Sequence, residues 1–226
     1  MIYPVLSLSQ TVVGTYGVQL LQLTFLISSA ETEPRKLPPL SLDERLRVAI
    51  DVARCLNYLH NERAIPHGNL KSTNILLETP HLTARLTDYS LHRILASAGT
   101  TEQVLNAGAL GYRPPEFASS SKPCPSLKSD VYAFGVILME LLTGKSSGEI
   151  VSGSTGVVDL TDWVKLLAAE NHAGECFDPM ILERDNGEHT HRTLDAMLQV
   201  ALRCILPAQD RPDMKSVYED LSVMVL

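Results

Sequence analysis

The sequence predicts a mainly α-helical domain with one small β-hairpin. Residues 130–143 read DVYAFGVILMELLT, an almost wholly apolar run that is typical of a helix in the middle of a core. Two short apolar runs at residues 75–77 and 84–86 flank Thr79-Pro80-His81, a pattern that predicts a hairpin. A length of 226 residues corresponds to one domain, or to one domain with an additional fragment.

The first 30 residues contain no Asp, Glu, Lys, Arg or His, and the first charged side chain is Glu31. Apolar and polar side chains alternate over most of residues 21–27, which predicts a strand. The apolar run at residues 18–27, with small residues after it, also resembles a signal peptide, although no Lys or Arg precedes it. A membrane anchor needs about 20 mainly apolar residues, and glutamines and glycines interrupt this stretch. Strand, signal peptide and anchor therefore remain open for the uncharged leader, residues 1–30.

A linker and a helix follow the leader. Three prolines within residues 31–39 indicate the linker. Ser41 and Glu44 then match the S-x-x-E capping box, in which each side chain satisfies a free backbone amide at a helix start. Apolar residues recur at helical spacing as far as Leu59, which predicts a helix with one buried face that ends near His60.

The second half of the chain is predicted to be helical as well. Gly144 is expected to end the apolar helix in the left-handed conformation. A loop rich in Ser and Gly is expected at residues 146–156, and further helices at residues 161–170, at residues 194–205 and from Asp213 onward.

Charge and cysteine content exclude some functions. The formal net charge is -7, which argues against the basic footprint of a nucleic-acid-binding protein. The four cysteines are far apart and form no C-x-x-C pair, so neither a zinc site nor a thioredoxin-like redox motif is expected. Reduced thiols are the default expectation for such a pattern.

Five short motifs lie in one order and spacing along the chain. They are HGNLKSTN at residues 67–74, DYS at 88–90, PPE at 114–116, SDVYAFGV at 129–136 and Arg211-Pro212. These motifs resemble H-R-D-L-K-x-x-N, D-F-G, A-P-E and the buried helix of protein kinases. The chain is similar to the plant leucine-rich-repeat receptor-like kinases, and the resemblance implies a protein kinase-like fold, C-terminal lobe only, over residues 40–226.

The resemblance implies that several catalytic parts are lost. Asn69 lies at the position of the catalytic Asp, and an amide does not accept the substrate proton as a carboxylate does. Gly68 replaces the Arg that pairs with an activation-loop phosphate, so phosphates on Ser97, Thr100 or Thr101 would find no Arg there. Ser90 replaces the Gly of D-F-G and Ala109 replaces a Thr that contacts the catalytic Asp and Lys, according to the same resemblance.

Other family positions are retained. Lys71 matches the catalytic-loop Lys, and Asn74 and Asp88 match the two magnesium-ligand positions that also serve nucleotide binding. The resemblance implies a buried ion pair between Glu116 and Arg211. It also implies that Asp130 braces the loop at residues 67–74, which corresponds to the family's catalytic loop and is called the catalytic loop below. These last three positions are structural in the family.

ATP and Mg²⁺ are the cofactors that the resemblance implies. No G-x-G-x-x-G loop, V-A-I-K motif or αC Glu precedes Leu40, so strong nucleotide binding by this sequence is not expected. The leader at residues 1–30 is too short for an N-terminal lobe, and residues 31–39 are hinge-like. At most, the strand at residues 21–27 would correspond to the last N-lobe strand.

We therefore expect a catalytically inactive pseudokinase domain of a receptor-like Ser/Thr kinase, which acts as a signalling interaction module. One alternative is an active ATP-dependent Ser/Thr protein kinase, and a second is a truncated, non-functional splice or gene-model product. Other receptor kinases or signalling proteins are the expected partners, and nucleic acid is not. By resemblance the chain lies at the cytoplasmic face of the plasma membrane, linked through a longer parent receptor or the apolar leader, or in the cytosol if the leader is no anchor.

Overall fold

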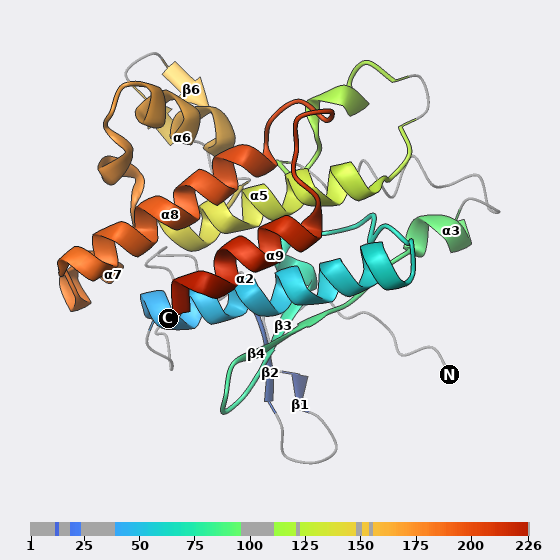
Figure 1. Cartoon of the computed structure of the whole chain (residues 1–226), viewed down its shortest axis with the longest axis horizontal. Helices are drawn as coiled ribbons and strands as arrows, with labels where there is room; N and C mark the ends of the chain where they lie inside the picture. The colour runs from blue at the N-terminus through green and yellow to red at the C-terminus, as the bar shows by residue number, and fades with distance from the viewer. Residues whose placement is uncertain are drawn as a thin grey trace.

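The computed structural model describes residues 12–13, 19–23, 39–95, 111–120, 123–147, 151–153 and 156–225. This part of the chain forms a lobe of packed helices with a small sheet on one side (Figure 1). The predicted mainly helical fold with a small hairpin is confirmed.

Two pairs of helices make up the body of the lobe. Helix α5 packs along α8, and α2 packs along α9 (Figure 1). Every residue from 129 to 143 in α5 is buried, which confirms its predicted place in the middle of the core. The bounds of these helices are Leu42–Asn57 for α2, Leu127–Thr143 for α5, Glu188–Cys204 for α8 and Met214–Ser222 for α9.

The predicted start and stop signals of these helices operate in the structure. The Ser41 backbone N–H donates to Glu44 Oε2 over 2.7 Å, and the Glu44 N–H donates to Ser41 Oγ over 3.3 Å, which closes the capping box of α2. A π-helical turn, Tyr58–Glu62, continues α2 to about its predicted end. Gly144 has φ = 69° and ends α5 in the left-handed conformation, as expected.

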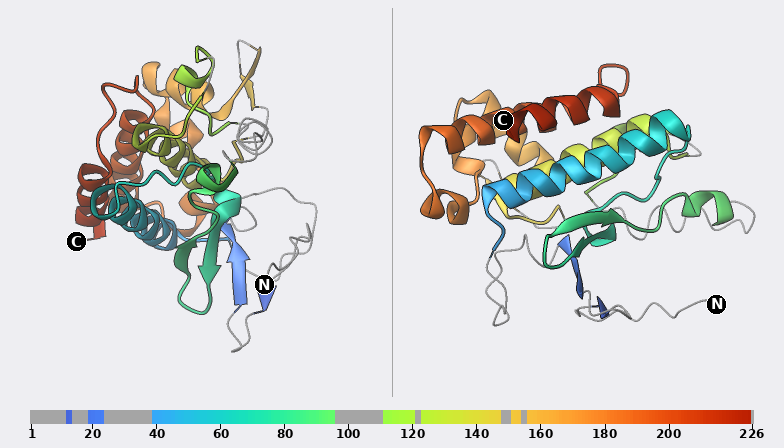
Figure 2. Two further views of the ribbon diagram at one scale, coloured as in Figure 1. Left: turned by 90° about the vertical axis from the view of Figure 1, so that its right-hand side faces the viewer. Right: turned by 60° about the horizontal axis from the view of Figure 1, so that its bottom comes forward.

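The sheet is larger than the predicted hairpin. Strands β3 (Ile75–Glu78) and β4 (Thr83–Leu86) form that hairpin. The leader adds two antiparallel strands at the free edge of β3, β2 (Gln19–Gln22) next to it and β1 (Val12–Val13) outermost. Figures 1 and 2 show this sheet beneath α2, on the side opposite α9.

Strand β2 begins two residues before the strand expected at residues 21–27 and overlaps it at Leu21 and Gln22. Leu23, directly after it, is fully buried. Residues 24–30 and most of the linker, residues 31–38, lie outside the described residues.

Several shorter elements complete the lobe, and some were not predicted. The loop expected at residues 146–156 contains one strand of a hairpin, because β-branched residues on both sides of Gly153 and Gly156 favour pairing. The helix expected from residue 194 begins six residues earlier. The further elements are β5 (Val151–Gly153), β6 (Gly156–Val158), α3 (Leu91–Leu95), α6 (Leu160–Ala169), α7 (Pro179–Arg184), and 3₁₀ turns at Ser72–Asn74, Pro115–Phe117, Ala173–Cys176 and Val223–Val225.

Sequence reasoning missed a buried ion pair that joins three helices. Arg45 in α2 is 1% exposed and donates to the Asp178 carboxylate, to the Leu141 carbonyl over 2.7 Å and to the Leu40 carbonyl over 3.0 Å. Asp178 also caps α7 through the Met180 N–H. Burial lowers the pKa of the Arg45 guanidinium from its ordinary value, and the charge of Asp178 opposes that shift.

Two further observations concern the chemistry of the described lobe. The thiols of Cys55, Cys124, Cys176 and Cys204 are free, as expected. None of the helices in the described ranges combines the length and the apolar character that crossing a bilayer requires.

Candidate functional site

Asp130, near the start of α5, anchors the backbone of the loop that contains Asn69. The Asp130 carboxylate accepts hydrogen bonds from the His67 N–H over 2.6 Å and from the Gly68 N–H over 2.9 Å, and it lies 2.9 Å from His60 Nε2. Asp130 is 1% exposed, so this carboxylate depends on these donors in place of water. The buried carboxylate thus fixes the backbone just before Asn69.

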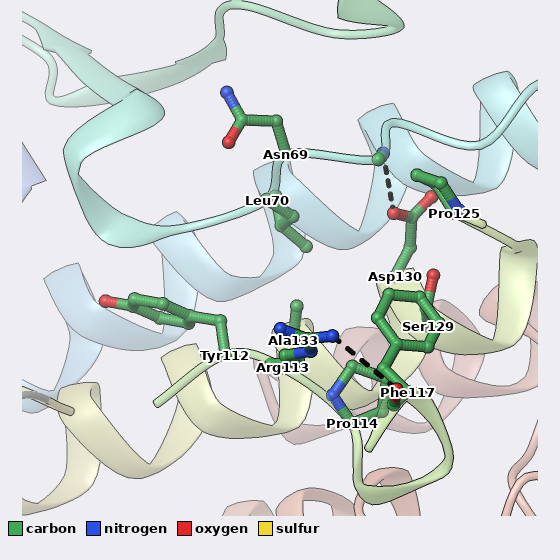
Figure 3. A pocket seen from close by; sticks show the side chains of 11 residues that line it. Asn69, Leu70, Tyr112, Arg113, Pro114, Phe117, Pro125, Ser129, Asp130 and Ala133 are labelled. Atoms are coloured by element: carbon green, nitrogen blue, oxygen red, sulfur yellow. Dashed lines mark hydrogen bonds between the residues drawn. The ribbon is translucent and has the colours of Figure 1, made fainter. Parts of the chain in front are cut away.

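Asn69 itself is half-buried and sits beside the anchored backbone. Its side chain points away from Asp130 (Figure 3). The Asn69 N–H donates to His67 Nδ1 over 3.3 Å, and its carbonyl accepts from Asn74 Nδ2 over 2.8 Å. A neutral carboxamide in this position can donate or accept a hydrogen bond, but it does not take up a proton near neutral pH as a catalytic carboxylate does.

The structure brings Asn74 and Asp88 close to the same loop. The Thr87 N–H and hydroxyl donate to the Asn74 carbonyl over 2.9 Å and 3.3 Å, which places Asp88 one residue away from this contact. Asp88 is exposed and has φ = 60°. Lys71 lies just before the 3₁₀ turn that carries Asn74, and its carbonyl accepts from the Asn74 N–H over 3.0 Å.

The donor set of Asp88 and Asn74 fits a hard cation in part. The Asn74 amide nitrogen is committed to Asn69, so its amide oxygen is the atom that could bind a metal, together with the Asp88 carboxylate. Mg²⁺ prefers oxygen ligands and is commonly held by one or two carboxylates plus substrate phosphates. Within the described residues no three His, Cys, Asp or Glu side chains form a metal-binding group. Phosphate oxygens and water would therefore have to complete the coordination.

A small pocket lies next to Asn69, between the catalytic loop, residues 112–117 and α5 (Figure 3). Its volume is about 40 Å³. Pockets that enclose small-molecule ligands usually have about 300 to 1,000 Å³, so this one does not accommodate a nucleotide. Its lining residues are Gly68, Asn69, Leu70, Tyr112, Arg113, Pro114, Phe117, Pro125, Ser129, Asp130 and Ala133.

Glu116 and Arg211 form an ion pair that is buried on one side only. Arg211 Nη1 and Nη2 donate to the two Glu116 oxygens over 2.6 Å and 2.8 Å, and its guanidinium lies 4.9 Å from the centre of the Tyr132 ring. The Arg211 side chain is 0% exposed, whereas that of Glu116 is 35% exposed. Partial burial raises the pKa of Glu116, but the hydrogen bonds and charge of Arg211 outweigh this effect and lower it below its ordinary value.

A second polar cluster ties the catalytic loop to α5, and sequence reasoning did not find it. The Tyr112 hydroxyl donates to Glu140 Oε1 over 2.7 Å and lies 2.8 Å from Ser72 Oγ, while the Ser147 N–H donates to the same Glu140 oxygen over 2.8 Å. Burial raises the pKa of Glu140 and the pKa of Tyr112 above their ordinary values. Glu140, an acidic residue inside the apolar run at residues 130–143, was the sequence signal that could have indicated this cluster.

Four residues named from the sequence have no described environment. Ser97, Thr100, Thr101 and Ala109 lie outside the described residues, so the activation-loop interpretation rests on the sequence alone.

Comparison with known proteins identifies the family. A family model described as protein tyrosine and serine/threonine kinase matches residues 23–221. The chain belongs to this kinase family. Its relatives in Arabidopsis thaliana include the LRR receptor-like serine/threonine-protein kinase GHR1, 55% identical over 83% of this chain, and the probable inactive receptor kinase At5g10020, 53% identical over 85%. They place this kinase lobe among the plant leucine-rich-repeat receptor-like kinases, and the chain spans 18% of the length of each.

Two solved structures resemble this kinase lobe closely. The kinase domain of maize SIRK1 (sucrose-induced receptor kinase 1) bound to AMP-PNP is 55% identical, with a TM-score of 0.79 over 91% of this chain and 66% of that one. The pseudokinase domain of BIR2, an immune regulator of the RLK/Pelle family, is 29% identical, with a TM-score of 0.71 over 90% of this chain and 57% of that one.

Proposed function

We propose that this receptor-kinase lobe is catalytically inactive and acts as an interaction module in receptor signalling. Asn69 carries the proposal. Asn69 occupies the position of the catalytic Asp, in a loop whose backbone N–H groups at His67 and Gly68 donate to the Asp130 carboxylate. Phosphoryl transfer uses that carboxylate to orient and deprotonate the attacking hydroxyl, and a carboxamide cannot replace it as a base.

The pattern of kept and lost residues supports the same proposal. The contacts that hold the lobe together are present, because Arg211 bonds to Glu116 and Asp130 bonds to the loop backbone. The base position and the pairing Arg at position 68 are replaced. Among the relatives, At5g10020 is described as a probable inactive receptor kinase and BIR2 has a pseudokinase domain, while GHR1 is described as a kinase.

Nucleotide binding by these 226 residues is proposed to be weak and dependent on Mg²⁺. The maize relative binds AMP-PNP, and Asp88 and Asn74 of this chain could share a cation with nucleotide phosphates. The printed sequence contains no glycine-rich loop before Leu40 to bind the phosphates. The Asp88 carboxylate and the Asn74 amide alone offer few contacts to a triphosphate and its metal, so we expect a low affinity.

Phosphate transfer from radiolabelled ATP tests the proposal. The purified chain, its Asp88→Ala variant and its Asn69→Ala variant are incubated with Mg²⁺, labelled ATP and a general protein substrate. We expect no incorporation above background for the wild-type chain, and the same background for Asp88→Ala. Incorporation by the wild-type chain that disappears in Asp88→Ala would disprove inactivity, because a contaminating kinase would not depend on Asp88.

An active Ser/Thr kinase is the second candidate, favoured by the retained positions Lys71, Asn74 and Asp88 and by the AMP-PNP-bound maize relative. It requires a different group to orient the attacking hydroxyl in place of Asn69. The same assay distinguishes the two candidates: activity that is insensitive to Asn69→Ala but lost in Asp88→Ala would favour the active kinase.

Other receptor kinases or signalling proteins are the proposed partners, at the cytoplasmic face of the plasma membrane and within a longer receptor. Titration of the labelled chain with the kinase domain of a plant leucine-rich-repeat receptor kinase tests this role. Saturable one-to-one binding that persists in Asp88→Ala would support an interaction role that is independent of catalysis. Binding that requires Asp88 and ATP would contradict it.

A further inference from the structure

The ring of His92 occupies the space next to Gly68 in which any other residue would place its β-carbon. A Cβ built on Gly68 would lie 2.4 Å from His92 Nδ1, 2.8 Å from His92 Cε1 and 2.9 Å from the Cβ of Pro125. The φ angle of Gly68 is +74°, a conformation that side chains disfavour even where space is available. Position 68 is therefore restricted to glycine for two independent reasons.

Ser90 ties the same segment to the catalytic loop by two hydrogen bonds. Its N–H donates to the His67 carbonyl over 2.7 Å, and its hydroxyl donates to the Pro66 carbonyl over 3.2 Å. The Ser90 carbonyl then accepts the Arg93 N–H over 3.0 Å, which forms the first turn of α3. Ser90 therefore connects the start of α3 directly to the two residues that precede Gly68.

Two groups therefore hold the loop backbone: the Asp130 carboxylate accepts from the N–H groups of His67 and Gly68, and Ser90 donates to the carbonyls of Pro66 and His67. His92 Nδ1 is buried without a hydrogen-bond partner in the part of the chain that the structure describes. Burial lowers the pKa of the His92 imidazole, and the charge of Asp130 opposes that shift. The His92 contact is therefore one of packing against the loop, in contrast to the hydrogen bonds made by Ser90.

We infer that Gly68, Ser90 and His92 form a latch that docks the first turn of α3 onto the catalytic loop and holds the segment after Asp88 closed against it. The latch is a conformational device that is separate from the replacement of the catalytic Asp by Asn69. It follows that restoring a carboxylate with Asn69→Asp leaves this segment docked, and that releasing the segment requires a change at position 68, 90 or 92.

Amide hydrogen exchange on the full chain tests the latch. The rates at Ser90 and Arg93 are compared in wild type, His92→Ala, Gly68→Ala and the double variant. We expect His92→Ala to speed exchange at both amides by about tenfold, because the packing that keeps α3 docked is removed. Gly68→Ala should speed exchange at both amides by about tenfold or more in the wild-type background. Its effect should be smaller once His92→Ala has removed the ring, while the strain of φ = +74° and the contact with Pro125 remain in both backgrounds.

Two controls make the outcome decisive. Gly144 has φ = +69°, and a Cβ built on it would lie 2.6 Å from Asp178 Oδ2. Gly144→Ala therefore imposes a similar backbone strain and a similar clash away from His92. The effect of Gly144→Ala should be the same with and without His92→Ala. Equal effects of Gly68→Ala in both backgrounds would overturn the latch. If Gly68→Ala does not fold, His92→Ala alone decides, because unchanged exchange at Ser90 and Arg93 would overturn the latch as well.

Discussion

Truncating the two partners of the Glu116–Arg211 ion pair should have unequal effects on stability. Arg211 is completely buried and makes four hydrogen bonds, two to Glu116 and one each to the carbonyls of Leu206 and Lys128. Arg211→Ala removes all of these and leaves a cavity beside the Tyr132 ring. Breaking a buried charged network typically costs about 3 to 5 kcal/mol, so we expect a loss of about 4 kcal/mol.

Glu116→Ala should cost less, although it leaves the buried guanidinium without its anion. The Glu116 side chain is 35% exposed, so water can reach the freed N–H groups, and Arg211 keeps its two carbonyl partners. We expect a loss of about 2 kcal/mol for Glu116→Ala and about 1 kcal/mol for Glu116→Gln, which retains one acceptor. Because the pKa of Glu116 is lowered, its contribution is present above pH 4.5 and is lost as the pH falls below that value.

Equilibrium unfolding in urea, followed by circular dichroism, measures these differences. Arg192→Ala is the matched control, because Arg192 is 71% exposed and its ion pair with Glu188 spans 3.7 Å at the surface. Such exposed pairs contribute about 0 to 1 kcal/mol. An Arg211→Ala loss no larger than that of Arg192→Ala, or a Glu116→Ala loss that exceeds that of Arg211→Ala, would refute the reasoning.

Three further predictions concern buried polar groups. Asp178→Ala should destabilise the lobe by about 3 to 5 kcal/mol, because it strands the Arg45 guanidinium; a thermal melt that is unchanged from wild type would contradict this. The raised pKa of Glu140 means that its folded state favours the protonated form, so stability should decrease as the pH rises above 4.5, and Glu140→Gln should flatten that dependence in urea titrations at several pH values. Burial lowers the pKa of His67, against the attraction of Asp130, so stability should decrease as the pH falls below 6.5; His67→Phe should reduce this loss, and an identical acid limb in the variant would contradict the assignment.

Local signals in the sequence predicted much of the fold. The capping box at Ser41, the apolar helix at residues 130–143 and the hairpin of β3 and β4 each depend on residues close together in the chain. Their spacing alone therefore determines them. The order of short motifs also singled out Asn69 and Asp88; in the structure, Thr87, next to Asp88, donates to Asn74 in the loop that carries Asn69.

Contacts between distant residues were the ones that the sequence could not reveal. The partners of the Arg45–Asp178 ion pair are 133 residues apart, and neither side chain carries a local pattern that names the other. The pairing of β2 with β3 joins the leader to a strand more than 50 residues away, and strand alternation predicts a strand without its partner. A family pattern indicates that Glu116 and Arg211 pair, but the exposure of Glu116 emerges only from how the 3₁₀ turn at Pro115–Phe117 packs.

The central claim is the proposal that this kinase lobe keeps the structural contacts of its family without an effective site for nucleotide binding and phosphate transfer. Titration calorimetry of the full chain with AMP-PNP, with and without Mg²⁺, tests it most directly. The account predicts binding no tighter than about 1 mM, corresponding to about -4 kcal/mol, and a further loss without Mg²⁺ or in Asp88→Ala. A micromolar dissociation constant that rises sharply in Asp88→Ala would contradict the account, because it would show an intact nucleotide and metal site.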